Sequence, residues 1–380
     1  MLRIGSVCID AIGRRDDVAG DGAELVPLPG CTVLPGLIDM HGYLSIDPDR
    51  PNPMAQMHGE DLAARRAIAV RHLMRDLLSG VTTLRVMGEG GGLDIILRNE
   101  IADGRLTGPS IVTAGAPLAP SGSHQAPPDG GIDSEQVLIR AIEDRAVQGV
   151  NWLKLVATGG VNASGDGGRR QIYDHQLMMR AAEAAAHRNL PLAVAAHGGP
   201  AIRDAIEAGA ATLEHCALLD DDEARRIAAG PTVPVLTLSR FFLPHGIEKS
   251  ARSAPDILQA VERARASYRR TVRTLADAGS DFCLGTDNMH GAIADDARLA
   301  VELGFRPGAV IRALTGTAAR VLRQAGEIGT LRPGSRANLI AVAGDPMTDI
   351  RALTRIRGIW RAGQRVADGE PTAISTGAAP

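Results

Sequence analysis

Aromatic residues are scarce in this chain of 380 residues, because Phe, Trp and Tyr together make up only 2% of it. Apolar residues still amount to 44%, an ordinary fraction for a globular protein, so the core must depend on Leu, Ile, Val and Ala. The shortage of rings argues against a stacking platform for single-stranded nucleic acid.

Cysteine is also rare, and no Cys-x-x-Cys pair occurs, so neither a thiolate metal site nor a disulfide framework is expected. No apolar run approaches the roughly 18 residues of a membrane span, and the N-terminus lacks the apolar core of a signal peptide. The net charge of −3 gives no basic stripe for nucleic acid or a membrane. We expect a cytoplasmic protein with a small-molecule substrate, and the sequence leaves open whether it forms a homo-oligomer.

From residue 30 onward, short apolar runs alternate with longer amphipathic stretches. Eight runs predict strands: Val33–His41, Val81–Met87, Ser110–Gly115, Trp152–Ala157, Leu192–His197, Thr212–Cys216, Val233–Leu238 and Asp281–Thr286. Helical patterns cover Leu62–Ser79, Ser134–Gln148, His175–Arg188, Ala201–Ala208, Asp221–Ala229, Ala254–Ala278 and Pro307–Arg323. Eight strands that alternate with helices indicate an α/β protein with a (β/α)₈ TIM barrel, and a doubly wound open sheet is the alternative.

The two ends of the chain have a different pattern. Short β-like runs such as Asn338–Val342 and Ile356–Trp360 are punctuated by Gly and Pro, and no long helix appears. We therefore predict that residues 1–32 and 328–375 together form one small β-sandwich-like domain, beside a barrel of residues 33–327.

The run Leu37–Tyr43 places Asp39, His41 and Tyr43 on one face of the first barrel strand, because side chains alternate along a strand. In a barrel this face points inward, and the last of these residues lies at the mouth, where barrel enzymes have their active sites. A histidine there can bind a metal or move protons. The alternative is a core histidine bonded to Asp39.

Lys154 lies within the apolar strand WLKLVA. A buried ammonium without a partner costs several kcal/mol, so this amine needs a partner or must lose its charge. One route is reaction of the neutral amine with carbon dioxide, which gives a carbamate able to bridge two metals. The alternative is a lysine that reaches the strand end and solvent.

Further polar residues end other strands. His215 ends the sixth strand and Asp287 the eighth, where a carboxylate can bind a metal or act as a base toward water; a helix cap is the alternative for Asp287. His197 closes the fifth strand, and His124 lies in the long loop after the third. Nitrogen and oxygen ligands of this kind are preferred by hard-to-borderline metals.

The chain resembles the amidohydrolase superfamily, and in particular its imidazolonepropionase-like and Xaa-Pro dipeptidase-like branch. The resemblance rests on VLPGLIDMHGYL, GVTTLR, WLKLVATGGV, IRDAIEAGAATLEHC, CLGTDNMHG and GTLRPGSRANLIAVAGDP, spread over about residues 32 to 345. It implies metal ligands at His41, Lys154 as a carboxylated lysine, His215 and Asp287. It also implies that Asp287 relays protons between a metal-bound water and the leaving group.

Three positions depart from the family pattern. Tyr43 stands where the family has the second histidine of the first strand, Ala195 stands at the ligand position of the fifth strand, and Val86 replaces a frequent aspartate. His197 follows Ala195 on the same face and is the one residue able to replace that ligand. We therefore expect zinc or another divalent metal at no more than one ion per chain, and leave open that none is bound. If none is bound, Lys154 should be an uncarboxylated amine.

The leading hypothesis is a hydrolase of C–N bonds in a small amide, peptide or cyclic amide, with Asp287, His215 and Tyr43 as catalytic residues. The rival is a metal-independent isomerase, lyase or cyclase that uses Tyr43, His215 and Asp287 for acid–base chemistry. A catalytically inactive relative is a third reading.

Four residues are candidates for substrate binding. Arg169 and Arg170, in the loop after the fourth strand, could clamp a carboxylate, or they are solvated surface charges. His124 and His290 complete this set.

Overall fold

The computed structural model describes residues 1–18, 24–48, 56–59, 61–123, 125–126, 130–161, 166–244, 246–247 and 255–368. The barrel strands are β4 (Leu37–Gly42), β5 (Val81–Val86), β6 (Ser110–Thr113), β7 (Leu153–Val156), β8 (Leu192–Ala196), β9 (Thr212–His215), β10 (Val233–Leu236) and β11 (Cys283–Leu284). All pair in parallel, as one sheet of β4–β5–β6 and one of β7 to β11. Parallel bridges from Leu118 to Leu155 and from Gly42 to Asp287 join the two sheets at both edges. The predicted (β/α)₈ fold is thereby confirmed.

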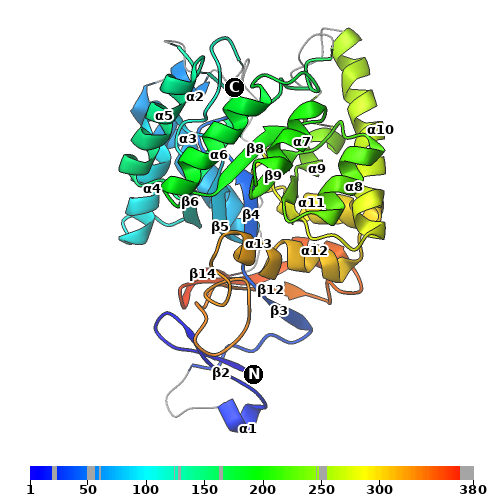
Figure 1. Cartoon of the computed structure of the whole chain (residues 1–380). Helices are drawn as coiled ribbons and strands as arrows, with labels where there is room; N and C mark the ends of the chain where they lie inside the picture. The colour runs from blue at the N-terminus through cyan, green and yellow to red at the C-terminus, as the bar shows by residue number, and fades with distance from the viewer. Residues whose placement is uncertain are drawn as a thin grey trace, which may run out of the picture.

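Helices surround these strands (Figure 1). They are α2 (Gln56–Gly59), α3 (Leu62–Leu78), α4 (Leu93–Ala102), α5 (Glu135–Gln148), α6 (His175–His187), α7 (Pro200–Glu207), α8 (Asp221–Ala229), α9 (Leu238–Phe242), α10 (Pro255–Asp277), α11 (Ile293–Leu303), α12 (Pro307–Ala313) and α13 (Gly316–Val321). Each longer helix turns an apolar stripe toward the strands, as Leu73 and Leu77 of α3 do beside Leu84 of β5. No helix in the described part of the chain is long and apolar enough to cross a membrane.

Strands from both chain ends form a separate sheet. Antiparallel β3 (Cys31–Pro35), β12 (Leu339–Ala343), β13 (Ile356–Arg361) and β14 (Gln364–Asp368) lie in the order β14–β13–β12–β3. A two-stranded sheet of β1 (Leu2–Ile4) and β2 (Ile9–Ile12) lies near it, with the short helix α1 (Arg15–Val18). This small β-region lies below the barrel, at the end where the barrel strands begin (Figure 1). The exact division into two domains stays a prediction.

The single first strand predicted over Val33–His41 is wrong, because the chain forms two strands there. β3 belongs to the small sheet and β4 to the barrel, and Gly36 separates them. A Cβ at Gly36 would lie 2.2 Å from the hydroxyl oxygen of Thr82 in β5. Only glycine therefore allows the link between β3 and β4 to pass this close to β5.

The helix pattern also differs in places from the prediction. The single helix over Pro307–Arg323 is two helices, because Thr315 has φ −137° and ψ −96° and interrupts the turn between α12 and α13. The strand predicted to reach Leu238 ends at Leu236, and Leu238 begins α9. Helices α4 and α11 were not predicted; α4 starts directly after a glycine run.

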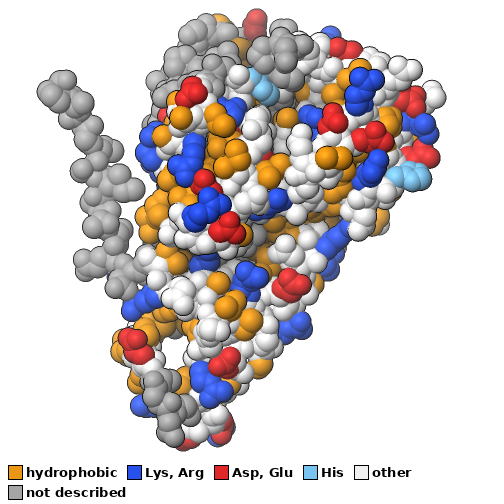
Figure 2. Space-filling view, turned by 90° about the vertical axis from the view of Figure 1, so that its left-hand side faces the viewer, with side chains coloured by type: hydrophobic (Ala, Val, Ile, Leu, Met, Phe, Trp, Pro, Cys, Tyr) orange, Lys and Arg blue, Asp and Glu red, His pale blue; other side chains and the backbone are white. Residues whose placement is uncertain are grey.

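Acidic and basic side chains alternate with apolar ones over the face of the molecule shown in Figure 2. On this face no broad surface of one sign appears, which agrees with the near-balanced charge of the sequence.

Candidate active site

Three charged or polar side chains form the inner layer of the barrel mouth. Glu214 of β9 accepts a hydrogen bond from Arg85 Nη2 at 2.7 Å and lies 2.7 Å from Nδ1 of His41. All three side chains are fully buried. Burial alone would raise the pKa of Glu214, but Arg85 and His41 together lower it to about 2, so the carboxylate is ionised.

This arrangement fixes the protonation of His41. Burial lowers the pKa of its imidazole, so the ring is neutral at pH 7. The ionised Glu214 accepts a hydrogen bond from the protonated Nδ1, which leaves Nε2 with a free lone pair. Among the described residues, no group forms a hydrogen bond with this buried Nε2. His41 therefore presents an unused ligand nitrogen to the barrel mouth.

Tyr43 and Lys154 form a direct pair next to this layer. Lys154 Nζ donates to Tyr43 Oη at 2.7 Å, and both side chains are buried. Burial lowers the pKa of Lys154 to about 8 and raises that of Tyr43 well above its usual value. A neutral phenol thus accepts a hydrogen bond from the buried lysine.

His215 and Asp287 have unusual backbone conformations. Their φ angles are +71° and +60°, in the left-handed region that residues other than glycine rarely adopt. On a regular strand, His215 would face away from the side that Glu214 faces. The left-handed turn instead brings its ring centroid to 4.6 Å from that of His41. Such backbone strain is concentrated at functional sites.

The two residues lie close enough to act together. His215 Nδ1 is 4.0 Å from Asp287 Oδ2 and 3.0 Å from the hydroxyl of Thr237 at the end of β10. The Asp287 amide donates to the His41 carbonyl at 2.7 Å, which holds the eighth strand end against the first. The close approach requires glycine at position 285, where a Cβ would lie 2.5 Å from His41.

The fifth strand contributes a histidine beyond its end. Ala195 pairs with Glu214 in the ladder, so its methyl group faces the barrel interior at the expected ligand position. His197 follows it, and its ring stacks on His215 with centroids 5.0 Å apart. The structure thus brings His41, Lys154, His215, Asp287 and His197 together at the mouth, although their roles stay predictions.

Comparison with known proteins agrees with this geometry. The amidohydrolase family matches residues 32–366. The chain belongs to the amidohydrolase family. It is a hydrolase of the type that acts on carbon–nitrogen bonds.

Characterised relatives of this amidohydrolase resemble it over most of its length. It is 26% identical to an ochratoxinase of Aspergillus niger, over 87% of this chain and 75% of that protein. It is 27% identical to an imidazolonepropionase of Nocardia farcinica, over 88% of this chain and 84% of that protein. A crystal structure of a Xaa-Pro dipeptidase with methionine in its active site superimposes with a TM-score of 0.86 at 25% identity, covering 97% of this chain and 94% of that one.

Metal binding is typical of amidohydrolases, and the residues here fit one ion better than two. The unused nitrogen of His41, the carboxylate of Asp287 and the ring of His215 are suitable donors. Tyr43 and Ala195 each remove a ligand, and Lys154 is engaged with the phenol. Two of the ligands that the family resemblance implies for a binuclear centre are therefore absent from this mouth.

One other cluster has donor atoms spaced for a metal. In the described residues, His175, Asp204 and Glu207 have potential ligand atoms within 4.8 Å of one another. They lie on α6 and α7, outside the mouth, and two of the three are exposed. This group is not the predicted site.

Of the predicted substrate contacts, Arg169 already has partners. It forms ion pairs with Asp220 at 3.2 Å and Glu223 at 2.9 Å, and the neighbouring Arg170 is exposed to solvent. A carboxylate clamp at these two arginines stays a prediction that the structure does not support.

The structure describes one of the two histidines that were predicted to bind substrate. His290 lies 3.0 Å from Asp76 through Nδ1, and its ring stacks on His72 with centroids 3.9 Å apart. This contact explains its burial without a substrate. His124 lies outside the described residues.

The sequence analysis missed Arg85, Glu214, Thr237 and Arg240. Glu214 directly precedes His215, and its inward orientation would have followed from strand alternation. Its pairing with Arg85, on a strand about 130 residues earlier, had no local signal in the sequence.

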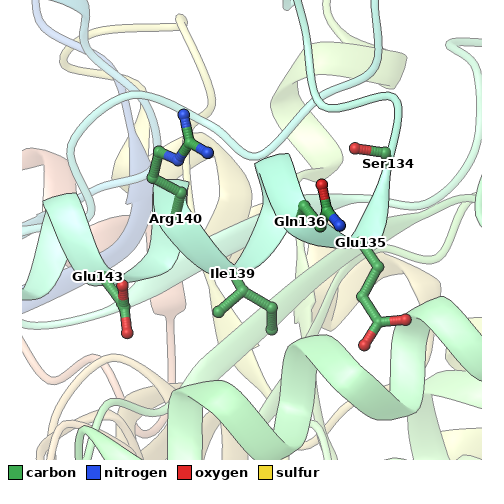
Figure 3. A pocket seen from close by; sticks show the side chains of 6 residues that line it. All are labelled: Ser134, Glu135, Gln136, Ile139, Arg140 and Glu143. Carbon is green, nitrogen blue, oxygen red and sulfur yellow. The ribbon is translucent and has the colours of Figure 1, made fainter.

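The surface hollow of Figure 3 lies along α5, on the outside of the barrel. Its lining is Ser134, Glu135, Gln136, Ile139, Arg140 and Glu143. None of the candidate active-site residues contributes to it, so it is unrelated to the chemistry.

Proposed function

We propose that this amidohydrolase cleaves the amide bond of a small N-acyl amino acid or dipeptide at its barrel mouth, with at most one divalent ion per chain. The observation that carries the proposal is the buried, unused Nε2 of His41, whose tautomer is fixed by Glu214. A nitrogen oriented in this way by a carboxylate is typical of histidines that bind catalytic metals.

In this mechanism, His41, Asp287 and one of His215 and His197 would hold the ion. When bound, a divalent ion would supply Lewis-acid chemistry, polarising the amide carbonyl and lowering the pKa of a water to about 7. Asp287 removes the proton of the attacking water and delivers it to the leaving nitrogen. Nδ1 of His215 lies 4.0 Å from Oδ2 of Asp287, so the two side chains face the same reacting group.

The relatives support a small substrate with an amide bond. The imidazolonepropionases and ochratoxinases are named for small-molecule substrates, and the Xaa-Pro dipeptidase structure contains a free amino acid in its active site. An amino acid is the product that an N-acyl amino acid or dipeptide hydrolase releases.

The test is a hydrolysis panel of N-acetyl amino acids, dipeptides and cyclic amides, with protein purified without chelators. We expect turnover of at least one N-acyl amino acid or dipeptide, and a loss of about 10³-fold in kcat for Asp287→Asn. Asp281→Asn is the matched control, because Asp281 lies just before the same strand, is exposed and, among the residues that the structure describes, pairs with Arg320 alone. No hydrolysis of any member, or full activity of Asp287→Asn, refutes the proposal.

A metal-independent reaction is the second candidate, and the hydrogen bond from Lys154 to Tyr43 favours it. In that case the ammonium and phenol are the acidic groups, and Asp287 is the base. Turnover that survives dialysis against a chelator, in protein shown by elemental analysis to hold no metal, would favour this candidate over the first.

A further inference from the structure

Arg240 lies at the mouth on a firmly anchored segment. It belongs to α9, which begins two residues after β10 ends. The Tyr268 hydroxyl accepts a hydrogen bond from the Thr237 amide at 2.9 Å, and the Asp296 carboxylate accepts one from the Ser239 amide at 2.9 Å. Side chains from α10 and α11 therefore fix the backbone on the strand side of Arg240, so its guanidinium starts from a defined position.

The guanidinium of Arg240 has no counter-ion among the described residues. No carboxylate of the described chain lies within 4.0 Å of it, and it makes no hydrogen bond there. Burial lowers the pKa of Arg240, and the charges of Asp287 and Tyr43 act on it in the opposite direction. The arginines Arg85 and Arg169, by contrast, are both paired with glutamates.

A guanidinium does not lose its proton in a protein, so it cannot escape burial by becoming neutral. Arg240 is partly buried. A partly buried cation without an anion is unfavourable, and a bound anion removes this cost. The planar group has donors spaced for both oxygens of a carboxylate.

We propose that Arg240 binds the free α-carboxylate of the substrate and so restricts this enzyme to amides that carry one. The inference rests on the proposed function, since it names the recognition element of the same site. It assigns to Arg240 the role that the sequence had suggested for Arg169 and Arg170. Arg240 binds the half of the substrate that leaves as an amino acid.

The test compares the binding of N-acetyl-L-methionine with that of its carboxamide, N-acetyl-L-methioninamide, by isothermal titration calorimetry. All proteins carry Asp287→Asn so that neither ligand is cleaved. We expect the acid to bind roughly 100-fold more tightly than the carboxamide. Arg240→Met should abolish this preference and leave carboxamide binding unchanged, and Arg240→Lys should recover only part of it because lysine lacks the planar fork.

Arg140→Met is the matched control, because Arg140 is an exposed arginine on α5 (Figure 3) and its loss changes the net charge equally. It should keep the full preference for the acid. Retention of the preference in Arg240→Met, or failure of the acid to bind the Asp287→Asn protein, overturns the inference.

The same assay separates the two proposals. If the acid binds through Arg240 but the parent protein cleaves no N-acyl amino acid, the proposed function fails and the role of Arg240 stands. If the parent protein cleaves the acid and the carboxamide equally well, the role of Arg240 fails and the amide hydrolase stands.

Discussion

The inner layer and the rim of the barrel mouth are built in opposite ways. In the inner layer, Arg85, Glu214 and His41 lie within regular strands, are fully buried, and have their charges paired. At the rim, His215 and Asp287 have left-handed backbones, and Arg240 has no counter-ion among the described residues. The difference indicates two functions. The inner layer holds His41 in one protonation state, and the rim carries groups whose binding partners are supplied by the substrate.

Removing the central charge of the inner layer should have the largest effect. Glu214→Gln leaves the buried guanidinium of Arg85 without its carboxylate, at a cost of about 3–5 kcal/mol in the free energy of unfolding. Without the Glu214 carboxylate, the proton of His41 is no longer held on Nδ1, so Nε2 is no longer kept as a free ligand nitrogen. Hydrolysis should therefore be lost. Urea denaturation and the hydrolysis assay measure the two effects.

Glu262→Gln is the control, since Glu262 pairs with Arg265 on the surface and should change stability by less than about 0.5 kcal/mol. A Glu214→Gln protein as stable as its parent would remove the distinction between the two layers.

The pH dependence of stability adds to the comparison, because two buried carboxyl groups next to these layers have a raised pKa. Burial raises the pKa of Asp39, below His41, and that of Glu89, after β5, each to about 7. The folded protein therefore binds these protons more tightly than the unfolded chain. The free energy of unfolding should fall as the pH rises from the ordinary carboxyl range to about 7, and this loss should end above it.

Glu89→Gln tests how much of this change in the free energy of unfolding with pH is caused by Glu89. It removes one of the protons that the folded protein binds more tightly, so the fall in stability per pH unit should decrease by up to about 1.4 kcal/mol. Chemical denaturation at several pH values between 5 and 8 measures it. An unchanged slope would mean that Glu89 is ionised in the folded protein at pH 5.

The smallest expected effect concerns the support of the rim. Thr237→Val removes the hydroxyl 3.0 Å from Nδ1 of His215 and preserves the shape of the side chain. Loss of one such supporting contact typically lowers activity by about 10-fold. We expect this decrease in kcat with an unchanged melting temperature, and a larger fall in stability than in kcat would assign Thr237 to the fold instead.

Much of the fold could be predicted from the sequence because barrel strands are short apolar runs between amphipathic helices. The runs over Leu192–His197 and Thr212–Cys216 match β8 and β9 within one residue at each end. The break at Gly36 could not be predicted, because Thr82, the neighbour that requires glycine there, is remote in sequence. Helix α4 was missed because its start has no capping side chain, only glycines.

The candidate site divides in the same way. His41, His215 and Asp287 were predicted because each stands at or next to a strand end, and the barrel brings strand ends together. Lys154 was predicted because it is a charged residue within an apolar strand. Arg240 was missed because it lies in a five-residue helix, which the sequence pattern does not distinguish from a loop. The hydrogen bond between Lys154 and Tyr43 joins two strands far apart in the chain, so only the folded structure reveals it.

The central proposal is that this mouth binds at most one metal ion, because Tyr43 and Ala195 replace ligands and Lys154 donates to the phenol. Elemental analysis of protein purified without chelators, combined with its intact mass, tests this most directly. The account predicts at most one divalent ion per chain and an unmodified Lys154, and a higher metal content after Tyr43→His combined with Ala195→His. Two fully occupied ions per chain, with the added mass of a carboxylated lysine in the unaltered protein, would contradict it.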